Sequence, residues 1–101
     1  MTTQMDRFVH DRMPAVADLP QMLYELPELQ FPGKLNAVVE LLDRHVADGH
    51  GERVLLRDAR GVLTYAQVLD RVNQTARVLI EDFGLVTGNR VLLRGGNSID
   101  M

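Results

Sequence analysis

Two stretches of the chain carry apolar side chains at helical spacing. In the first stretch, apolar residues recur every three or four positions, with polar residues between them. This spacing predicts an amphipathic helix over Leu35–Ala47, with Asn36 as its N-cap and Gly49 as a left-handed residue at its C-terminal end. The apolar positions of this helix are Leu35, Val38, Val39, Leu42 and Val46.

The second stretch begins at a capping motif. Thr64 stands three residues before Gln67, which is the Thr-x-x-Gln form of the capping box. A helix over Tyr65–Phe83 should follow, with Gly84 as the glycine at its C-terminal end and the Tyr65 ring packed on the hairpin. The predicted buried stripe of this helix consists of Val68, Leu69, Val72, Ala76, Leu79 and Phe83.

Three shorter apolar runs have strand character. Arg53–Asp58 and Val62–Thr64 flank the turn sequence Asp58-Ala59-Arg60-Gly61, which predicts a β-hairpin. Arg90–Arg94 has the continuous apolar centre that is typical of a strand covered on both faces. Too few residues follow it for a crossover to a parallel neighbour, so we expect the sheet to continue in sequence outside this chain. Ser98 is expected to cap a helix beginning at Ile99.

Residues 1–34 differ from the rest of the chain. Four prolines recur there, and each removes a backbone donor and favours extended backbone before it. We expect residues 1–34 to form an extended arm with a short helix over Thr3–Arg12, and residues 35–101 to form the beginning of a larger domain. A partly mobile leader is the alternative for the arm. The prolines are Pro14, Pro20, Pro27 and Pro32.

Composition excludes several classes of protein. The chain is 46% hydrophobic and 25% charged, which is ordinary for a globular domain. It has no cysteine, so disulfides, thiolate metal ligands and a cysteine nucleophile are excluded. The net charge is only −3, with no Lys/Arg cluster, basic stripe or long apolar run. We therefore expect a cytoplasmic protein with neither a nucleic-acid partner nor a membrane partner.

Three motifs, in this order, resemble the start of the large domain of adenylate-forming enzymes. The first is Leu63-Thr64-Tyr65-Ala66-Gln67-Val68-Leu69, where the capped helix opens. The second is the loop Gly84–Val91, which ends in Gly-Asn-Arg-Val. The third is Leu93–Ser98, at the exit of the predicted strand, and the resembling region covers about Leu35–Met101.

The arm resembles a narrower group. Leu26–Pro32, followed by Leu35-Asn36 and Glu40–Asp43, is similar to the leader of aryl-CoA ligases of the benzoate and 2-aminobenzoate type. This similarity implies an aromatic acid as the substrate.

The resemblance to the adenylate-forming enzymes implies an AMP-forming acid–CoA ligase with an α/β fold. The hairpin, the two helices and the buried strand would belong to the large domain, whose sheet is mainly parallel. In such enzymes a carboxylate attacks the α-phosphate of ATP, and coenzyme A then displaces AMP to give a thioester. The implied cofactors are ATP, Mg²⁺ and coenzyme A. The implied partners are the rest of the ligase chain, a small carboxylic acid and, as a candidate, a second copy in a homodimer.

The groups that perform this chemistry in the family lie in motifs that the chain lacks. These are a Ser/Thr/Gly-rich phosphate loop, a Tyr-x-x-Thr-Glu segment, a ribose-binding aspartate and a lysine of a C-terminal domain. The chain's only lysine, Lys34, lacks the surrounding loop. We therefore expect no catalytic residue here, and no activity from these 101 residues alone.

Asn97 is the candidate cofactor-binding residue. It lies in Gly95–Ser98, which follows the carboxyl end of the predicted strand and precedes a predicted helix N-terminus. A plain strand-to-helix turn is the alternative. A patch for the phosphates of coenzyme A is a further candidate, against the alternative of charges that protect strand edges. Its four arginines are Arg53, Arg57, Arg90 and Arg94.

No metal site is expected. His45 and His50 are five residues apart across a helix end, a spacing that does not place both on one face. Two other classes of function stay open beside the ligase. One is a stand-alone small α/β protein-interaction module whose apolar arm docks a partner. The other is an adenylating domain of the peptide-synthetase or luciferase type, which shares the same motif.

Overall fold

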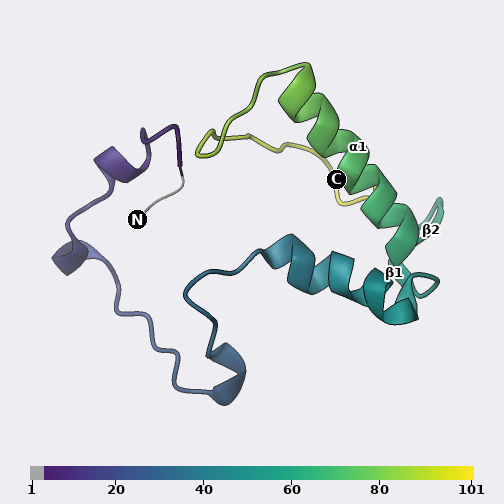
Figure 1. Ribbon diagram of the computed structural model, residues 1–101, viewed down its shortest axis with the longest axis horizontal. Coiled ribbons are helices and arrows are strands. Elements are labelled where there is room, and N and C mark those ends of the chain that lie inside the picture. The colour runs from purple at the N-terminus through teal and green to yellow at the C-terminus, as the bar shows by residue number, and fades with distance from the viewer. Residues whose placement is uncertain (1–3) are drawn as a thin grey trace. The chain divides into compact units, whose positions relative to one another are not determined.

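The computed structural model of this chain describes residues 4–101, which fall into two compact units. The larger unit comprises Asn36–Leu85 and Arg90–Met101, and it contains both predicted helices and the hairpin (Figure 1). The smaller unit comprises the arm up to Leu35 together with Val86–Asn89. No helix among residues 4–101 is both long and apolar enough to cross a membrane.

The first predicted helix is present over residues 37–50. Asn36 caps it as predicted, because its Oδ1 accepts the N–H groups of Val38 at 3.0 Å and of Val39 at 3.2 Å. Helical dihedrals are broken at Gly49, whose φ of 82° is the expected left-handed conformation. The helical stretch thus begins and ends slightly later than predicted. Most of it consists of two wide, π-type segments, η4 (Val39–Asp43) and η5 (Val46–His50).

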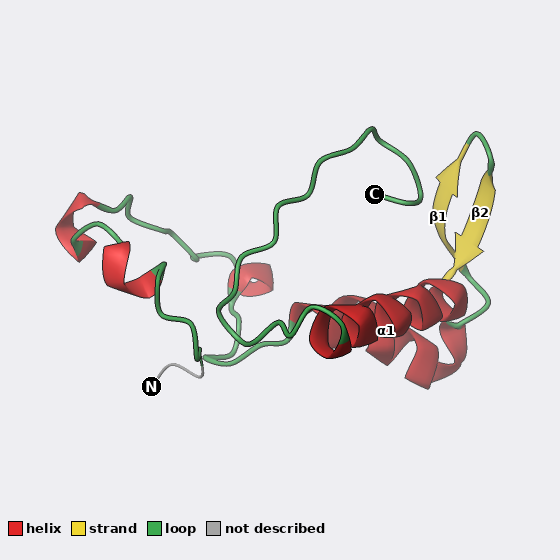
Figure 2. Ribbon diagram, turned by 90° about the horizontal axis from the view of Figure 1, so that it is seen from above, coloured by secondary structure: helices red, strands yellow, loops and turns green. Residues whose placement is uncertain are grey.

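The predicted hairpin is confirmed. Strands β1 (Val54–Asp58) and β2 (Gly61–Thr64) pair antiparallel and lead directly into the helix α1 (Figure 2). The pair Asp58 and Gly61 closes the turn, and the register is irregular between Val54 and Leu56. The two strands form a sheet of their own, so the described residues do not test the larger parallel sheet expected from the sequence.

The second helix, α1 (Tyr65–Glu81), starts at the capping box that the sequence predicts. Thr64 N donates to Gln67 Oε1 at 2.9 Å, and Gln67 N donates to Thr64 Oγ1 at 3.3 Å. The N–H groups of Tyr65 and Ala66 donate to the carbonyls of Arg53 and Gly51, both at 2.9 Å. The chain itself therefore satisfies the first N–H groups of α1, and none of these is left for an anion.

The glycine predicted at the C-terminal end of α1 is confirmed, but the helix is shorter than predicted. The helix ends at Glu81 rather than at Phe83. Gly84 has the positive φ of 65° expected of a glycine after a helix, and its N–H donates to Ile80 O at 3.2 Å.

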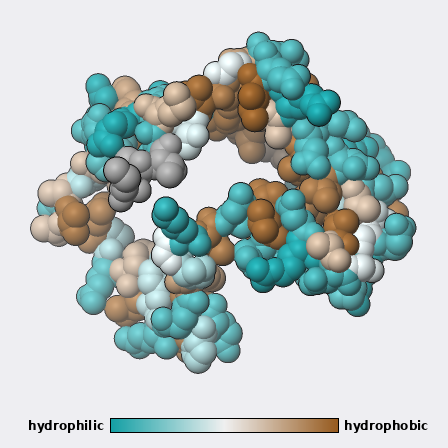
Figure 3. All heavy atoms as spheres, in the orientation of Figure 1, coloured by the Kyte–Doolittle hydropathy of each residue, from teal (hydrophilic) through white to brown (hydrophobic). Residues whose placement is uncertain are grey.

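The apolar faces of the larger unit are only thinly covered. Helix α1 contacts the hairpin, η4 and η5, and Leu42, with 6% of its surface exposed, is the one buried residue among residues 4–101. The Tyr65 ring lies 4.8 Å from the ring of His45, so it packs against the first helix. Many apolar side chains stay at the surface, drawn in brown in Figure 3.

The predicted stripe of α1 is confirmed only in part. Four of its members are half-buried, whereas Ala76 is exposed and Phe83 has 71% of its surface exposed. The physical reason is that only a hairpin, one helix and the C-terminal segment are available to cover this face. The half-buried members are Val68, Leu69, Val72 and Leu79.

Two predictions for the C-terminal segment are wrong. Arg90–Arg94 forms no strand, and Leu92 at its centre has 92% of its surface exposed. A strand requires a hydrogen-bonded neighbour, and β1 and β2 pair only with each other. The helix predicted after Ser98 is a single turn, in which Met101 N donates to Ser98 O at 3.2 Å.

The arm is less helical than predicted. The expected helix begins at Thr3, which lies outside the described residues, and of the remainder only the last turn is helical. Asp6 explains the difference, because its Oδ1 accepts the N–H of Phe8 at 2.9 Å and so competes with helical hydrogen bonding. From residue 4 onward, the arm contains three single 3₁₀ turns, η1 (His10–Arg12), η2 (Val16–Asp18) and η3 (Pro27–Leu29).

Candidate functional site

The hairpin turn positions the aspartate at the centre of a polar cluster. Asp58 is the last residue of β1, and its Oδ1 accepts the backbone N–H groups of Arg60 at 2.8 Å and of Gly61 at 3.1 Å. An aspartate that bonds its own turn in this way is common, because its short side chain reaches the backbone two or three residues on. The carboxylate is therefore held in place by the turn itself.

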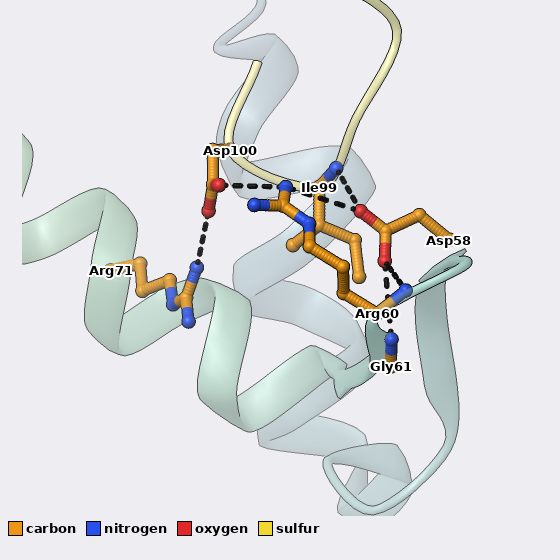
Figure 4. Close-up of polar contacts among 6 residues, drawn as sticks. All are labelled: Asp58, Arg60, Gly61, Arg71, Ile99 and Asp100. Carbon is orange, nitrogen blue, oxygen red and sulfur yellow. Dashed lines mark hydrogen bonds and ion pairs between the residues drawn. The ribbon is translucent and has the colours of Figure 1, made fainter.

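The second oxygen of Asp58 binds the C-terminal segment. Its Oδ2 accepts the N–H of Ile99 at 3.1 Å and faces Arg60 Nη2 at 3.4 Å (Figure 4). These contacts stabilise the ionised carboxylate and lower the pKa of Asp58, with the Ile99 N–H as the largest cause and the Arg60 N–H as the next. Asp58 thus connects two segments that lie far apart in the sequence.

Asp100 completes the cluster. Its Oδ2 accepts from Arg60 Nη2 at 2.8 Å and its Oδ1 from Arg71 Nη1 at 3.4 Å, so α1 and the hairpin turn hold the same carboxylate (Figure 4). The hydrogen bond to Asp100 is the main cause that raises the pKa of Arg60. All three side chains are exposed, so water and salt weaken these ion pairs. We call Asp58, Arg60, Arg71, Ile99 and Asp100 the Asp58 cluster.

The side chains of the Asp58 cluster are suited to holding segments of the chain together. It borders a surface hollow of about 270 Å³ whose lining contains no serine, threonine, cysteine, histidine, tyrosine or lysine. Two arginines face two aspartates, so an anion would have to displace a carboxylate to bind. Among residues 4–101, no three histidine, aspartate or glutamate side chains are grouped to hold a metal ion. The cluster fastens the turn at Ser98–Met101 to the hairpin and to α1.

An apolar groove adjoins the cluster. It has a volume of about 780 Å³ and lies between β2, α1 and the C-terminal segment. Its lining is mostly aliphatic, with Arg71 and Asp100 of the Asp58 cluster as its charged members. Such a lining favours packing against other apolar groups. Its main aliphatic residues are Leu63, Val68, Val72, Leu79 and Leu93.

Asn97, the predicted cofactor-binding residue, lies in the same region. It is exposed and lines a hollow of about 310 Å³ together with Leu56, Asp58 and Ile99. The helix N-terminus that motivated the prediction is absent, since only one turn follows Ser98. A role for Asn97 in cofactor binding stays a prediction.

The other residues singled out from the sequence do not gather into a site. Among residues 4–101, Arg53, Arg57 and Arg94 form no ion pair, and all three are exposed. Lys34 is exposed in the arm. His45 contacts Tyr65 through its ring.

The Asp58 cluster itself was missed by the sequence analysis. The sequence predicts the Asp58–Gly61 turn but not the ion pair between Arg71 and Asp100. The Asp-x-x-Gly spacing was a signal that Asp58 would bond its own turn. No local signal pairs Asp58 with Ile99 or Arg71 with Asp100, because these contacts join segments about 40 and 30 residues apart.

Several acyl-CoA synthetases are similar to this chain over part of its length. It is 40% identical over 67 residues to the acetyl-coenzyme A synthetase of Mycobacterium tuberculosis, which is 60% of this chain and 10% of that protein. It is 42% identical over 65 residues to the acetyl-coenzyme A synthetase of Streptomyces avermitilis, which is 58% of this chain and 10% of that protein. Over this stretch the chain is similar to acetyl-coenzyme A synthetases.

A second kind of relative matches a longer stretch. A hybrid PKS-NRPS synthetase of Macrophomina phaseolina is 38% identical over 86 residues, which cover 84% of this chain and 2% of that protein. The matched region thus spans about a tenth or less of the curated relatives. No protein-family profile matches the chain, and no solved structure matches it.

Proposed function

We propose that this chain is a structural segment of an AMP-forming acid–CoA ligase. The observation that carries the proposal is the identity of 40 to 42% to acetyl-coenzyme A synthetases over 58 to 60% of the chain. In such a ligase, ATP with Mg²⁺ activates a carboxylic acid, and coenzyme A receives the acyl group. The described residues supply a capped helix, a hairpin and an anchored C-terminal turn.

The structure supports a scaffolding role for these residues. The Asp58 cluster holds no nucleophile, and the apolar groove beside it is lined for packing. We assign this groove to contact with the rest of the ligase chain. An α/β large domain, a cytoplasmic location and a homodimer are further parts of the proposal.

The similarities favour more than one acid as the substrate. The names of the relatives favour acetate, whereas the resemblance of Leu26–Pro32 to the leader of aryl-CoA ligases favours an aromatic acid. The peptide-synthetase alternative is favoured by the match to the hybrid synthetase. A panel of acetate, benzoate, 2-aminobenzoate and amino acids separates these substrates.

The test has two parts. The first is the mass of the native product in its source cells, detected with an antibody against residues 36–101. We expect a product several times heavier than 11.4 kDa, and a product of 11.4 kDa would leave the interaction module as the better explanation. The second is ATP–pyrophosphate exchange with the acid panel. We expect exchange from the heavier product and none from the 101-residue chain.

A further inference from the structure

The loop Val86–Asn89 is a tight turn whose own closure does not use the Thr87 carbonyl. Asn89 N donates to Val86 O at 3.0 Å, and Asn89 Oδ1 accepts from Val86 N at 3.0 Å, so the turn is closed from both sides. Gly88 has a φ of 99° at the third position, where a turn with positive φ needs glycine. The turn therefore leaves the Thr87 carbonyl and the Asn89 Nδ2 donor unused by its own closure.

The N-terminal arm uses both groups. Thr87 O accepts the N–H groups of Met5 at 2.8 Å and of Asp6 at 3.0 Å. Asn89 Nδ2 donates to Asp6 Oδ2 at 2.8 Å. The amide orientation is consistent, because Asn89 Oδ1 already accepts the Val86 N–H and the NH₂ group must face Asp6.

Because Gly88 has no side chain, the backbone of Asp6 can lie close to the turn. A Cβ atom at this position would lie 2.1 Å from the backbone oxygen of Asp6, which is far inside van der Waals contact. A side chain at position 88 would therefore displace the arm, whatever its chemistry.

We infer that Val86–Asn89 is a docking site for an acidic peptide segment with a bent backbone, and that its occupant is the chain's own arm at Met5–Asp6. The turn accepts two consecutive backbone N–H groups and donates to one carboxylate. This inference goes beyond the proposed ligase function and does not depend on which acid is activated.

Asn89→Asp tests the site with a minimal change. The new carboxylate keeps an acceptor for the Val86 N–H, but it replaces the donor to Asp6 with a second negative charge. We expect hydrogen exchange at the Met5 and Asp6 amides to become about tenfold faster, which corresponds to about 1.4 kcal/mol. The control is Asn73→Asp, the same change at an exposed position of α1, and it should leave these amides unchanged.

The double variant Asp6→Asn/Asn89→Asp decides whether the effect is specific. It restores one donor and one acceptor between the two side chains, and it should return the exchange rates to near those of the original chain. Failure of this rescue, or unchanged exchange in the single variant, would overturn the inference. Exchange rates that depend on protein concentration would assign the arm to the turn of a second copy, and would overturn the intrachain assignment. The same amides in Gly88→Ala should also lose protection, through the steric overlap.

Discussion

Asp58 joins the hairpin turn to the C-terminal segment by accepting N–H groups from both. Its carboxylate bonds Arg60 N, Gly61 N and Ile99 N, and each of these bonds favours the ionised form. The pKa of Asp58 is thereby held below its ordinary value of 3.8. A group with a lowered pKa in the folded state contributes stability that is present above its unfolded pKa and is lost as the pH falls through its folded pKa.

Protonation of Asp58 should therefore loosen the C-terminal turn in acid. We expect the protection of the Ile99 amide against hydrogen exchange to be constant above pH 3.8 and to fall below it, after correction for the intrinsic exchange rate. Asp58→Asn should lower this protection at neutral pH and remove its pH dependence. Asp70→Asn, on the exposed face of α1, is the matched control and should behave as the original chain does.

Thr64 has a purely local role. Its side chain accepts the Gln67 N–H, and the Gln67 side chain returns a bond to the Thr64 N–H. Thr64→Ala removes one of these bonds and should cost about 1 kcal/mol in the free energy of unfolding measured with urea. Thr75 lies in the middle of α1 and caps no helix end, so Thr75→Ala is the control. An equal loss in the free energy of unfolding for Thr75→Ala would contradict this explanation.

At the scale of elements, the two helices of the larger unit pack against each other with little buried surface. Leu42 in η4 is buried, while its neighbour Leu41 has 70% of its surface exposed. Helix α1 contacts both η4 and η5. We therefore expect Leu42 to contribute strongly to the pairing of the helices.

The neighbouring leucines give a matched pair of variants. Leu42→Ala removes buried atoms and leaves a cavity, so we expect a loss of about 2 kcal/mol in the free energy of unfolding, at the low end for such changes because the surrounding core is small. Leu41→Ala changes the same number of atoms at the surface and should cost less than about 0.5 kcal/mol. Circular dichroism during urea unfolding measures both, and equal losses would show that the contact is not formed.

On the scale of the whole chain, the dominant feature is apolar surface without a covering layer. Leu92 and its neighbours Val91 and Leu93 are exposed in a segment of high strand propensity, and the groove beside α1 is also apolar. Exposed apolar surface of this kind is typical of contact regions with other protein.

The isolated chain should therefore self-associate through this segment. Leu92→Lys interrupts the apolar run and should lower the weight-average mass measured by sedimentation at a given concentration. Val16→Lys places the same charge at a residue with 86% of its surface exposed, but in a 3₁₀ turn of the arm flanked by alanines, and should have little effect. A chain that is monomeric before any substitution would instead favour the stand-alone module.

Elements stabilised by neighbours in sequence could be predicted well. The cap at Asn36, the capping box of α1, the hairpin turn and the left-handed Gly49 all depend on groups within a few residues of one another. The Asp58 cluster could not be predicted, because its bonds join segments that come together only when the chain folds.

The sequence alone therefore determined that the hairpin and the two helices of the larger unit form and which residues cap those helices, since the donors and acceptors involved are local. The tertiary structure decided which apolar residues are covered and whether Arg90–Arg94 becomes a strand. Burial and strand pairing both require a second surface, and a residue's own sequence neighbours do not supply one. For the same reason, only the folded chain reveals the contacts of Asp58 with Ile99 and of Asn89 with Asp6.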